Sequence, residues 1–152
     1  MKTDRSKGFN LIELVIALAI VAVLSTVAYA SYSSGVTKAK RAEAKSALLK
    51  MMQQEEKFFT QNNRYIVFGK SSNDPDAVNF LWYSSDVAGK SSYELEATAC
   101  KDGDIKSCVL ITAVPGSSNV DNRFQDLVCG NFTLNSNGVK GYTGSGSKEQ
   151  CW

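Results

Sequence analysis

The sequence predicts an α+β protein: a long N-terminal α-helix, apolar in its first half, packed on a small antiparallel β-sheet with a disulfide-closed C-terminal loop. Three observations lead to this prediction. The stretch from Phe9 to Asn62 contains no proline and few residues that disfavour a helix. Short segments with alternating polarity follow it, and all four cysteines lie in the second half of the chain, from Cys100 onward. A helix followed by strands is typical of the α+β class.

The first half of the predicted helix, Phe9–Tyr29, is apolar apart from Glu13. At the rise of an α-helix this stretch is roughly 31 Å long, close to the thickness of a bilayer's hydrocarbon core. The basic residues Lys2, Arg5 and Lys7 precede it. Since positive charge is retained on the cytoplasmic side, we predict a single membrane pass with a cytoplasmic N-terminus.

The second half, Thr37–Asn62, is polar and rich in alanine, lysine, glutamate, glutamine, methionine and leucine, which favour helices. If both halves are continuous, the helix is roughly 80 Å long. Gly35 is a point where the helix can loosen, and Gln61-Asn62-Asn63 is expected to end it. Apolar residues near helical spacing predict the side that packs on the sheet: Ala44, Leu48, Met51, Met52, Phe58 and Phe59.

The segment Arg64–Lys90 is expected to connect the helix to the sheet, with a turn at Ser71–Asp76. Its aromatic residues are expected to hold it on the domain. Alternation and composition then predict four strands: Ser92–Ala99, Cys108–Val114, Leu127–Leu134 and Val139–Tyr142. The glycine-rich segment Thr143–Ser147 is expected to be flexible.

The cysteines are Cys100, Cys108, Cys129 and Cys151. Four cysteines allow three disulfide connectivities, or they stay as free thiols. A small domain behind a membrane segment favours disulfides in an oxidising compartment. We favour Cys100–Cys108 and Cys129–Cys151, because each pair encloses a local loop.

Composition argues against an enzyme. The chain has no histidine, so it lacks the commonest general base and metal ligand, and it has no glycine-rich phosphate loop. We expect no cofactor and no metal. Lys2, Arg5 and Lys7 against Asp4 account for the whole net charge of +2, so the chain from Phe9 onward is neutral. Direct binding of nucleic acid is therefore not expected.

The residues Lys7-Gly8-Phe9-Asn10-Leu11-Ile12-Glu13-Leu14 and the apolar run after them resemble the class III signal of type IV pilins. The resemblance implies that a prepilin peptidase cleaves between Gly8 and Phe9 and methylates the new N-terminus of Phe9. It implies a leader over 1–8, a transmembrane and filament-core segment over 9–34, and a periplasmic or extracellular head over 35–152. Many pilins have glycine at the position of Ala22 and proline at the position of Ala30. Because glycine and proline can loosen or kink a helix, this chain is expected to have a straighter helix than those pilins.

Glu13 lies inside the apolar span, where a carboxylate costs a few kcal/mol. Cleavage after Gly8 would create a free amine at Phe9. In a bundle of parallel helices, the amine of one chain can neutralise the Glu13 of its neighbour. The alternative is a glutamate that extends to the membrane interface.

The C-terminal part resembles PilE-type minor pilins of Gram-negative bacteria: Cys129-Gly-Asn-Phe-Thr-Leu-Asn135, then Gly138, and finally Cys151-Trp152. This resemblance implies a minor subunit of a type IV pilus. It would be held in the inner membrane, assembled with other pilins by the inner-membrane platform and exposed on the cell surface, serving twitching motility, adhesion and DNA uptake. The alternatives are a major pilin, a type II secretion pseudopilin and a DNA-binding minor pilin of a competence pilus.

Overall fold

The computed structural model describes residues 10–101 and 103–152. These residues form one long helix, a four-stranded sheet and three short helical segments. The elements in chain order are α1 (Leu11–Asn62), η1 (Pro75–Asn79), η2 (Ala88–Lys90), β1 (Tyr93–Ala99), β2 (Val109–Pro115), β3 (Phe132–Asn135), β4 (Lys140–Tyr142) and α2 (Lys148–Cys151). The α+β class is confirmed.

Helix α1 continues through Gly35 and ends at Asn62, the end that the sequence predicts. Asn63 follows in the left-handed conformation, with φ of 53°, and its N–H donates to the Phe59 carbonyl at 2.8 Å. Asparagine tolerates this conformation and commonly caps helices in this way.

The chain divides into two compact units, with the boundary between Lys38 and Ala39. We call residues 10–38 the stem and residues 39–152 the head.

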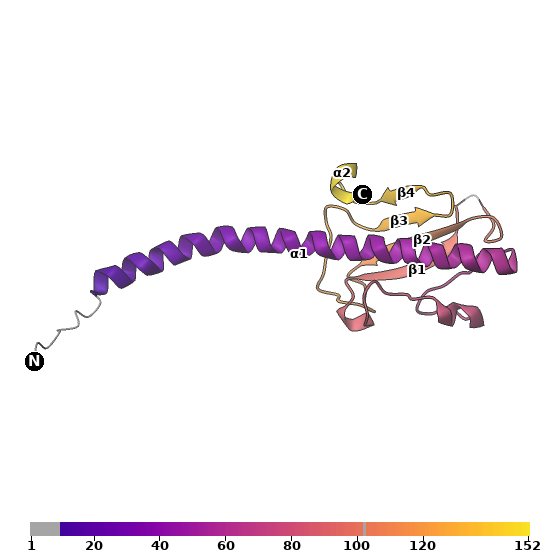
Figure 1. Cartoon of the computed structure of the whole chain (residues 1–152), viewed down its shortest axis with the longest axis horizontal. Coiled ribbons are helices and arrows are strands. Elements are labelled where there is room, and N and C mark those ends of the chain that lie inside the picture. The colour runs from indigo at the N-terminus through magenta and orange to yellow at the C-terminus, as the bar shows by residue number, and fades with distance from the viewer. Residues whose placement is uncertain (1–9, 102) are drawn as a thin grey trace, which may run out of the picture. The chain divides into compact units, whose positions relative to one another are not determined.

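The sheet of the head is antiparallel throughout, in the order β1-β2-β3-β4. Figure 1 shows that α1 crosses one face of this sheet. Buried and less buried residues alternate along β1 and β2, which is the pattern of a sheet with one covered face. The core joins helix and sheet residues: Ala44, Leu48, Met51 and Met52 from α1, and Leu95, Ala97, Ile111, Ala113, Phe132 and Leu134 from the strands.

The connecting segment is held down by its aromatic residues, as expected. Phe68 stacks on Phe80 at 5.0 Å between ring centroids, and Tyr65 stacks on Phe59 at 4.6 Å. Asp74 caps η1 by accepting the N–H of Asp76. The same segment also covers the free edge of β1, since the carbonyls of Phe68 and Trp82 accept N–H groups from Ala97 and Leu95.

The predicted third strand was wrong over its first half, because β3 begins only at Phe132. The residues before it form a turn in which Asp126 accepts the N–H of Cys129 through its side chain and that of Gly130 through its backbone. Gly130 has φ of 63°, and a Cβ there would lie 2.5 Å from Thr143 Oγ1. These local bonds compete with strand pairing, and a hydrophobic pattern does not reveal them.

The prediction of a flexible segment over Thr143–Ser147 was also wrong. Gly144 and Gly146 donate their N–H groups to the carbonyls of Cys129 and Val128 at 2.9 and 2.8 Å. A Cβ on Gly144 would lie 2.1 Å from the Val128 carbonyl oxygen. The glycines therefore permit close approach of two backbone segments, rather than flexibility.

Candidate functional site: the stem and the distal end of the head

The stem exposes a continuous apolar surface. Every large apolar side chain from Leu11 to Leu24 is more than half exposed in the single chain. By length and composition the helix is able to cross a membrane, and none of the residues in its most apolar stretch is buried. Such a surface requires lipid or other helices around it.

Glu13 lies in the first turn of α1, and its Oε2 accepts the N–H of Asn10 at 3.0 Å. A carboxylate in this position satisfies a free N–H group and complements the positive end of the helix dipole. The predicted cleavage residues, Gly8 and Phe9, lie outside the described residues, so the structure does not place the amine that is expected to pair with Glu13.

Within the head, the part of α1 that begins at Ala39 is held to the turn before β3 by a buried ion pair between Arg41 and Asp126. The guanidinium binds both carboxylate oxygens, at 2.7 and 2.6 Å, and Tyr93 donates its hydroxyl to Asp126 Oδ2 at 2.8 Å. Burial alone would raise the pKa of Asp126, but hydrogen bonds from Arg41, Cys129 and Tyr93 lower it overall. Burial and the Asp126 carboxylate raise the pKa of Tyr93, so its hydroxyl stays a donor.

Two disulfides hold the loops of the sheet. Cys100 pairs with Cys108 at the ends of the β1–β2 loop, and Cys129 pairs with Cys151, each with Cα atoms 5.5 Å apart. This is the connectivity that the sequence spacing favours. Cys129 and Cys151 are fully buried, whereas Cys100 and Cys108 lie half-buried at the edge of the domain.

Three chain segments meet at one end of the head, which we call the distal end: residues 61–65, the loop 100–108 and the turn 135–139. Tyr65 N–H donates to the Ile105 carbonyl at 3.1 Å, which joins the end of α1 to the loop. On the other side of the loop, Ser136 N–H donates to the Val109 carbonyl at 3.0 Å. In Figure 1 this end lies at the C-terminus of α1.

Exposed lysines gather at the distal end. Lys101 and Lys106 are exposed on the disulfide-closed loop, and Lys140 is exposed at the start of β4, 5.1 Å above the Trp152 ring. The carboxylates of Glu56 and Asp104 accept hydrogen bonds from Tyr65 and from the Lys106 N–H. Asp104 is itself exposed and Glu56 is half-buried, so the described part of this end carries lysine ammonium groups together with carboxylates.

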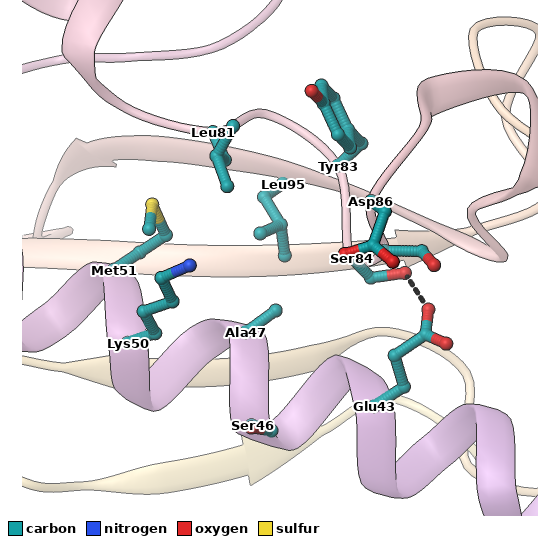
Figure 2. A pocket seen from close by; sticks show the side chains of 11 residues that line it. Glu43, Ser46, Ala47, Lys50, Met51, Leu81, Tyr83, Ser84, Asp86 and Leu95 are labelled. Atoms are coloured by element: carbon teal, nitrogen blue, oxygen red, sulfur yellow. Dashed lines mark hydrogen bonds between the residues drawn. The ribbon is translucent and has the colours of Figure 1, made fainter.

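A groove of about 500 Å³ lies between α1 and the segment before β1. Figure 2 shows Ser84 donating its hydroxyl to Glu43, at 2.8 Å, at one end of the groove, with Met51 and Leu95 among the residues that line it. The bond ties the connecting segment to α1. Among the described residues, no group of histidine, cysteine or acidic side chains is placed to hold a metal ion.

Comparison with known families agrees with the long helix and the small sheet. The family described as "Type IV minor pilin ComP, DNA uptake sequence receptor" has a model that matches residues 30–133. The chain belongs to the ComP family of type IV minor pilins. A second model, the prokaryotic N-terminal methylation motif, matches residues 3–29 of this ComP-family pilin. The predictions of a type IV pilin and of minor-pilin status are confirmed.

Individual proteins also resemble this ComP-family pilin. The type IV major pilin protein PilA of Myxococcus xanthus is 27% identical over 124 residues, which cover 79% of this chain and 52% of PilA. The chain thus spans about half the length of that relative. A solved type IV pilin from Shewanella oneidensis is 23% identical with a TM-score of 0.46, over 76% of this chain and 96% of that one.

Sequence reasoning missed two features of the ComP-family head. Glu55 is fully buried, and only its spacing from Leu48, Met51 and Met52 on one helical face indicates this. The expectation that nucleic acid is not bound directly disagrees with the family's description as a DNA receptor. That expectation used the net charge of the whole chain, whereas the exposed lysines of the distal end are contributed by separate loops.

Proposed function

We propose that this chain is the DNA-binding subunit of a type IV pilus that takes up DNA, and that its distal end binds the duplex. The observation that supports this best is the lysine-bearing loop 100–108, closed by Cys100–Cys108 and joined to the end of α1 through Ile105. The family's description as a DNA uptake sequence receptor supports the same function.

The chemistry of the distal end suits a polyanion. Lysine ammonium groups on exposed loops bind phosphates and release condensed counterions, which supplies most of the affinity of a protein for DNA. The disulfide and the hydrogen bonds to Tyr65 and Ser136 fix the two ends of the loop and the backbone at Ile105. Less conformational entropy is then lost when DNA binds.

Replacing both Lys101 and Lys106 by alanine is expected to weaken binding of duplex DNA by about 10-fold or more, and equally for all sequences. The slope of log affinity against log salt should fall by about two, roughly one for each lysine–phosphate pair removed. Fluorescence anisotropy with a labelled duplex, on the full chain in mild detergent, measures both quantities.

Lys90→Ala is the matched control, since Lys90 is also exposed but lies in η2, ahead of the opposite end of β1. It should change affinity and slope little. Equal losses from Lys90→Ala and from the double variant would place the DNA elsewhere, and a double variant with unchanged affinity would reject the distal end as the binding surface.

We also propose that the stem serves anchoring and assembly. A prepilin peptidase would remove residues 1–8 and methylate Phe9, residues 9–34 would cross the inner membrane once with the N-terminus cytoplasmic, and residues 35–152 would fold outside it. The assembly platform would then transfer the subunit to a filament in which apolar helices pack together. The exposed apolar residues of the stem and the N-terminal methylation motif support this sequence of events.

Glu13→Ala is expected to leave membrane insertion intact, since it removes a charge from the apolar span, while incorporation into filaments falls sharply. The physical reason is that the Phe9 amine of a neighbour then enters the helix bundle without a counter-charge. Immunoblots of sheared filaments and of membranes compare the two pools. Intact mass shows that the variant is still cleaved, and normal incorporation would rule out the pairing.

A further inference from the structure

We infer that the side-chain amides of Gln61, Asn63 and Asn137 read base edges in the bound duplex, whereas Lys101 and Lys106 bind its phosphates. This inference rests on the proposed function, that the distal end binds DNA. It adds which residues distinguish one DNA sequence from another. The lysines alone would bind every duplex with similar affinity, because phosphates carry no sequence information.

Asn63 stands on a rigid corner beside the lysine-bearing loop. Its own N–H is bound to the Phe59 carbonyl at 2.8 Å, and Phe59 stacks on Tyr65, which lies two residues after Asn63 in the chain. Tyr65 makes two hydrogen bonds: its N–H donates to the Ile105 carbonyl, and its hydroxyl donates to the Glu56 carboxylate at 2.9 Å. These contacts fix the backbone from which the exposed Asn63 side chain extends, and a specific contact requires such a fixed starting point.

Asn137 stands on a second corner, on the other side of the loop. It belongs to the turn between β3 and β4, which is closed by the Gly138 N–H on the Asn135 carbonyl at 2.9 Å. Ser136 fixes this turn to the beginning of β2: its N–H donates to the Val109 carbonyl, and its hydroxyl accepts the Val109 N–H. The lysine-bearing loop therefore lies between two fixed corners, each with an exposed asparagine.

Exposure and chemistry single out these amides. Gln61, Asn63 and Asn137 are all exposed. The amide of Asn62, by contrast, donates to the Phe58 carbonyl at 3.0 Å and serves the helix end. An asparagine or glutamine amide offers one donor and one acceptor side by side, and pairs with the N6 and N7 atoms of adenine in the major groove. We therefore expect adenine at the positions that these residues contact.

The test is selection of bound sequences from a random duplex library by the full chain in mild detergent. Wild-type protein should enrich a defined sequence. The triple variant Gln61→Ala, Asn63→Gly and Asn137→Ala should lose that preference, with the affinity ratio of selected to scrambled duplex falling about 10-fold or more. Glycine is used at position 63 because it retains the left-handed conformation of the helix cap.

Two further readouts separate reading of bases from binding of phosphates. The salt slope of the triple variant should equal that of wild type, whereas the Lys101→Ala and Lys106→Ala variant lowers the slope and retains the sequence preference. Gln53→Ala removes an exposed amide earlier on α1 and should change neither quantity.

A triple variant that enriches the same sequence as wild type would overturn the inference. So would a wild-type chain that binds every duplex equally, although the proposed function would then still stand. A wild-type chain that binds no duplex would overturn both.

Discussion

Asp126→Ala is expected to lower the free energy of unfolding of the head by about 3–5 kcal/mol, because it leaves the Arg41 guanidinium buried without a counter-charge. The Asp126 side chain is fully buried, and that of Arg41 is only 11% exposed. The Tyr93 hydroxyl and the Cys129 N–H lose their acceptor at the same time. This single carboxylate thus joins α1, β1 and the turn before β3.

Urea unfolding of the full chain in mild detergent, followed by tryptophan fluorescence, measures this loss. Asp121→Asn is the matched control, since Asp121 forms longer and more exposed ion pairs with Lys40 and Arg123, at 3.7 and 3.5 Å. Pairs of that kind contribute about 0–1 kcal/mol. Equal losses from the two variants would contradict the importance of the buried pair.

The lowered pKa of Asp126 adds a pH signature to this prediction. The ionised carboxylate is favoured in the folded state, so its contribution is complete above the ordinary pKa of an aspartate, about 3.9. It is lost as the pH falls from there through the lower folded pKa. Asp126→Asn should therefore show less acid destabilisation than wild type below about pH 4, from a lower starting stability.

The long periodic elements were the part of this fold that the sequence predicted well. The stripe from Ala44 to Met52 has regular helical spacing and β1 alternates in polarity from Tyr93 to Thr98, so each residue adds to one signal. Strand β2 is instead marked by its β-branched residues. Asn62 and Asn63 then mark the end of α1 by their cap chemistry. Such features depend on local sequence alone.

The parts that failed depend on contacts between distant segments. The stretch before β3 looks like a strand, but Arg41 lies 85 residues from Asp126 and holds that carboxylate where it organises a turn. By sequence, Gly144 belongs to a glycine-rich segment typical of flexible linkers. In the structure its backbone lies directly against the Val128 carbonyl. The residues adjacent to Asp126 and Gly144 in the sequence do not indicate that Arg41 and the Val128 carbonyl are their contacts.

The candidate site could be predicted in its stem and not in its head. Glu13 stands out because it is the one charge in an apolar run. The residues of the distal end, by contrast, come from 61–65, 100–108 and 135–139, and become one surface only through the sheet register and the Tyr65–Ile105 hydrogen bond. A sum of charges over the chain does not show which lysines become neighbours on the folded surface.

Glu55 is a buried carboxyl next to this surface. Its Oε2 accepts the Ile66 N–H at 3.0 Å, while its Oε1 has no hydrogen-bond partner among the described residues. Burial raises the pKa of Glu55, and the nearby charge of Glu56 raises it further. The hydrogen bond from the Ile66 N–H and the charge of Arg64 lower it, and the net result is a pKa of about 7. Relative to an ordinary glutamate this shift corresponds to about 3 kcal/mol.

The direction of the effect follows from the proton balance. Below about pH 4.3 the carboxyl is neutral in both the folded and the unfolded chain, so its burial carries no charge penalty. Between that pH and about 7 the unfolded chain loses the proton while the folded chain retains it, and stability falls as the pH rises. Above about pH 7 the folded chain holds a buried carboxylate, and the full penalty remains.

Glu55→Gln should therefore be more stable than wild type at pH 8, by about 1–3 kcal/mol, and close to wild type at pH 4.5. The amide oxygen can still accept the Ile66 N–H, and a neutral amide is less costly to bury than a carboxylate. Urea unfolding at a series of pH values measures the difference. Glu56→Gln, one residue away but only half-buried and bound to the Tyr65 hydroxyl, should not reproduce it. A Glu55→Gln variant whose stability changes with pH between 5 and 8 as steeply as that of wild type would show that Glu55 is not the group that titrates.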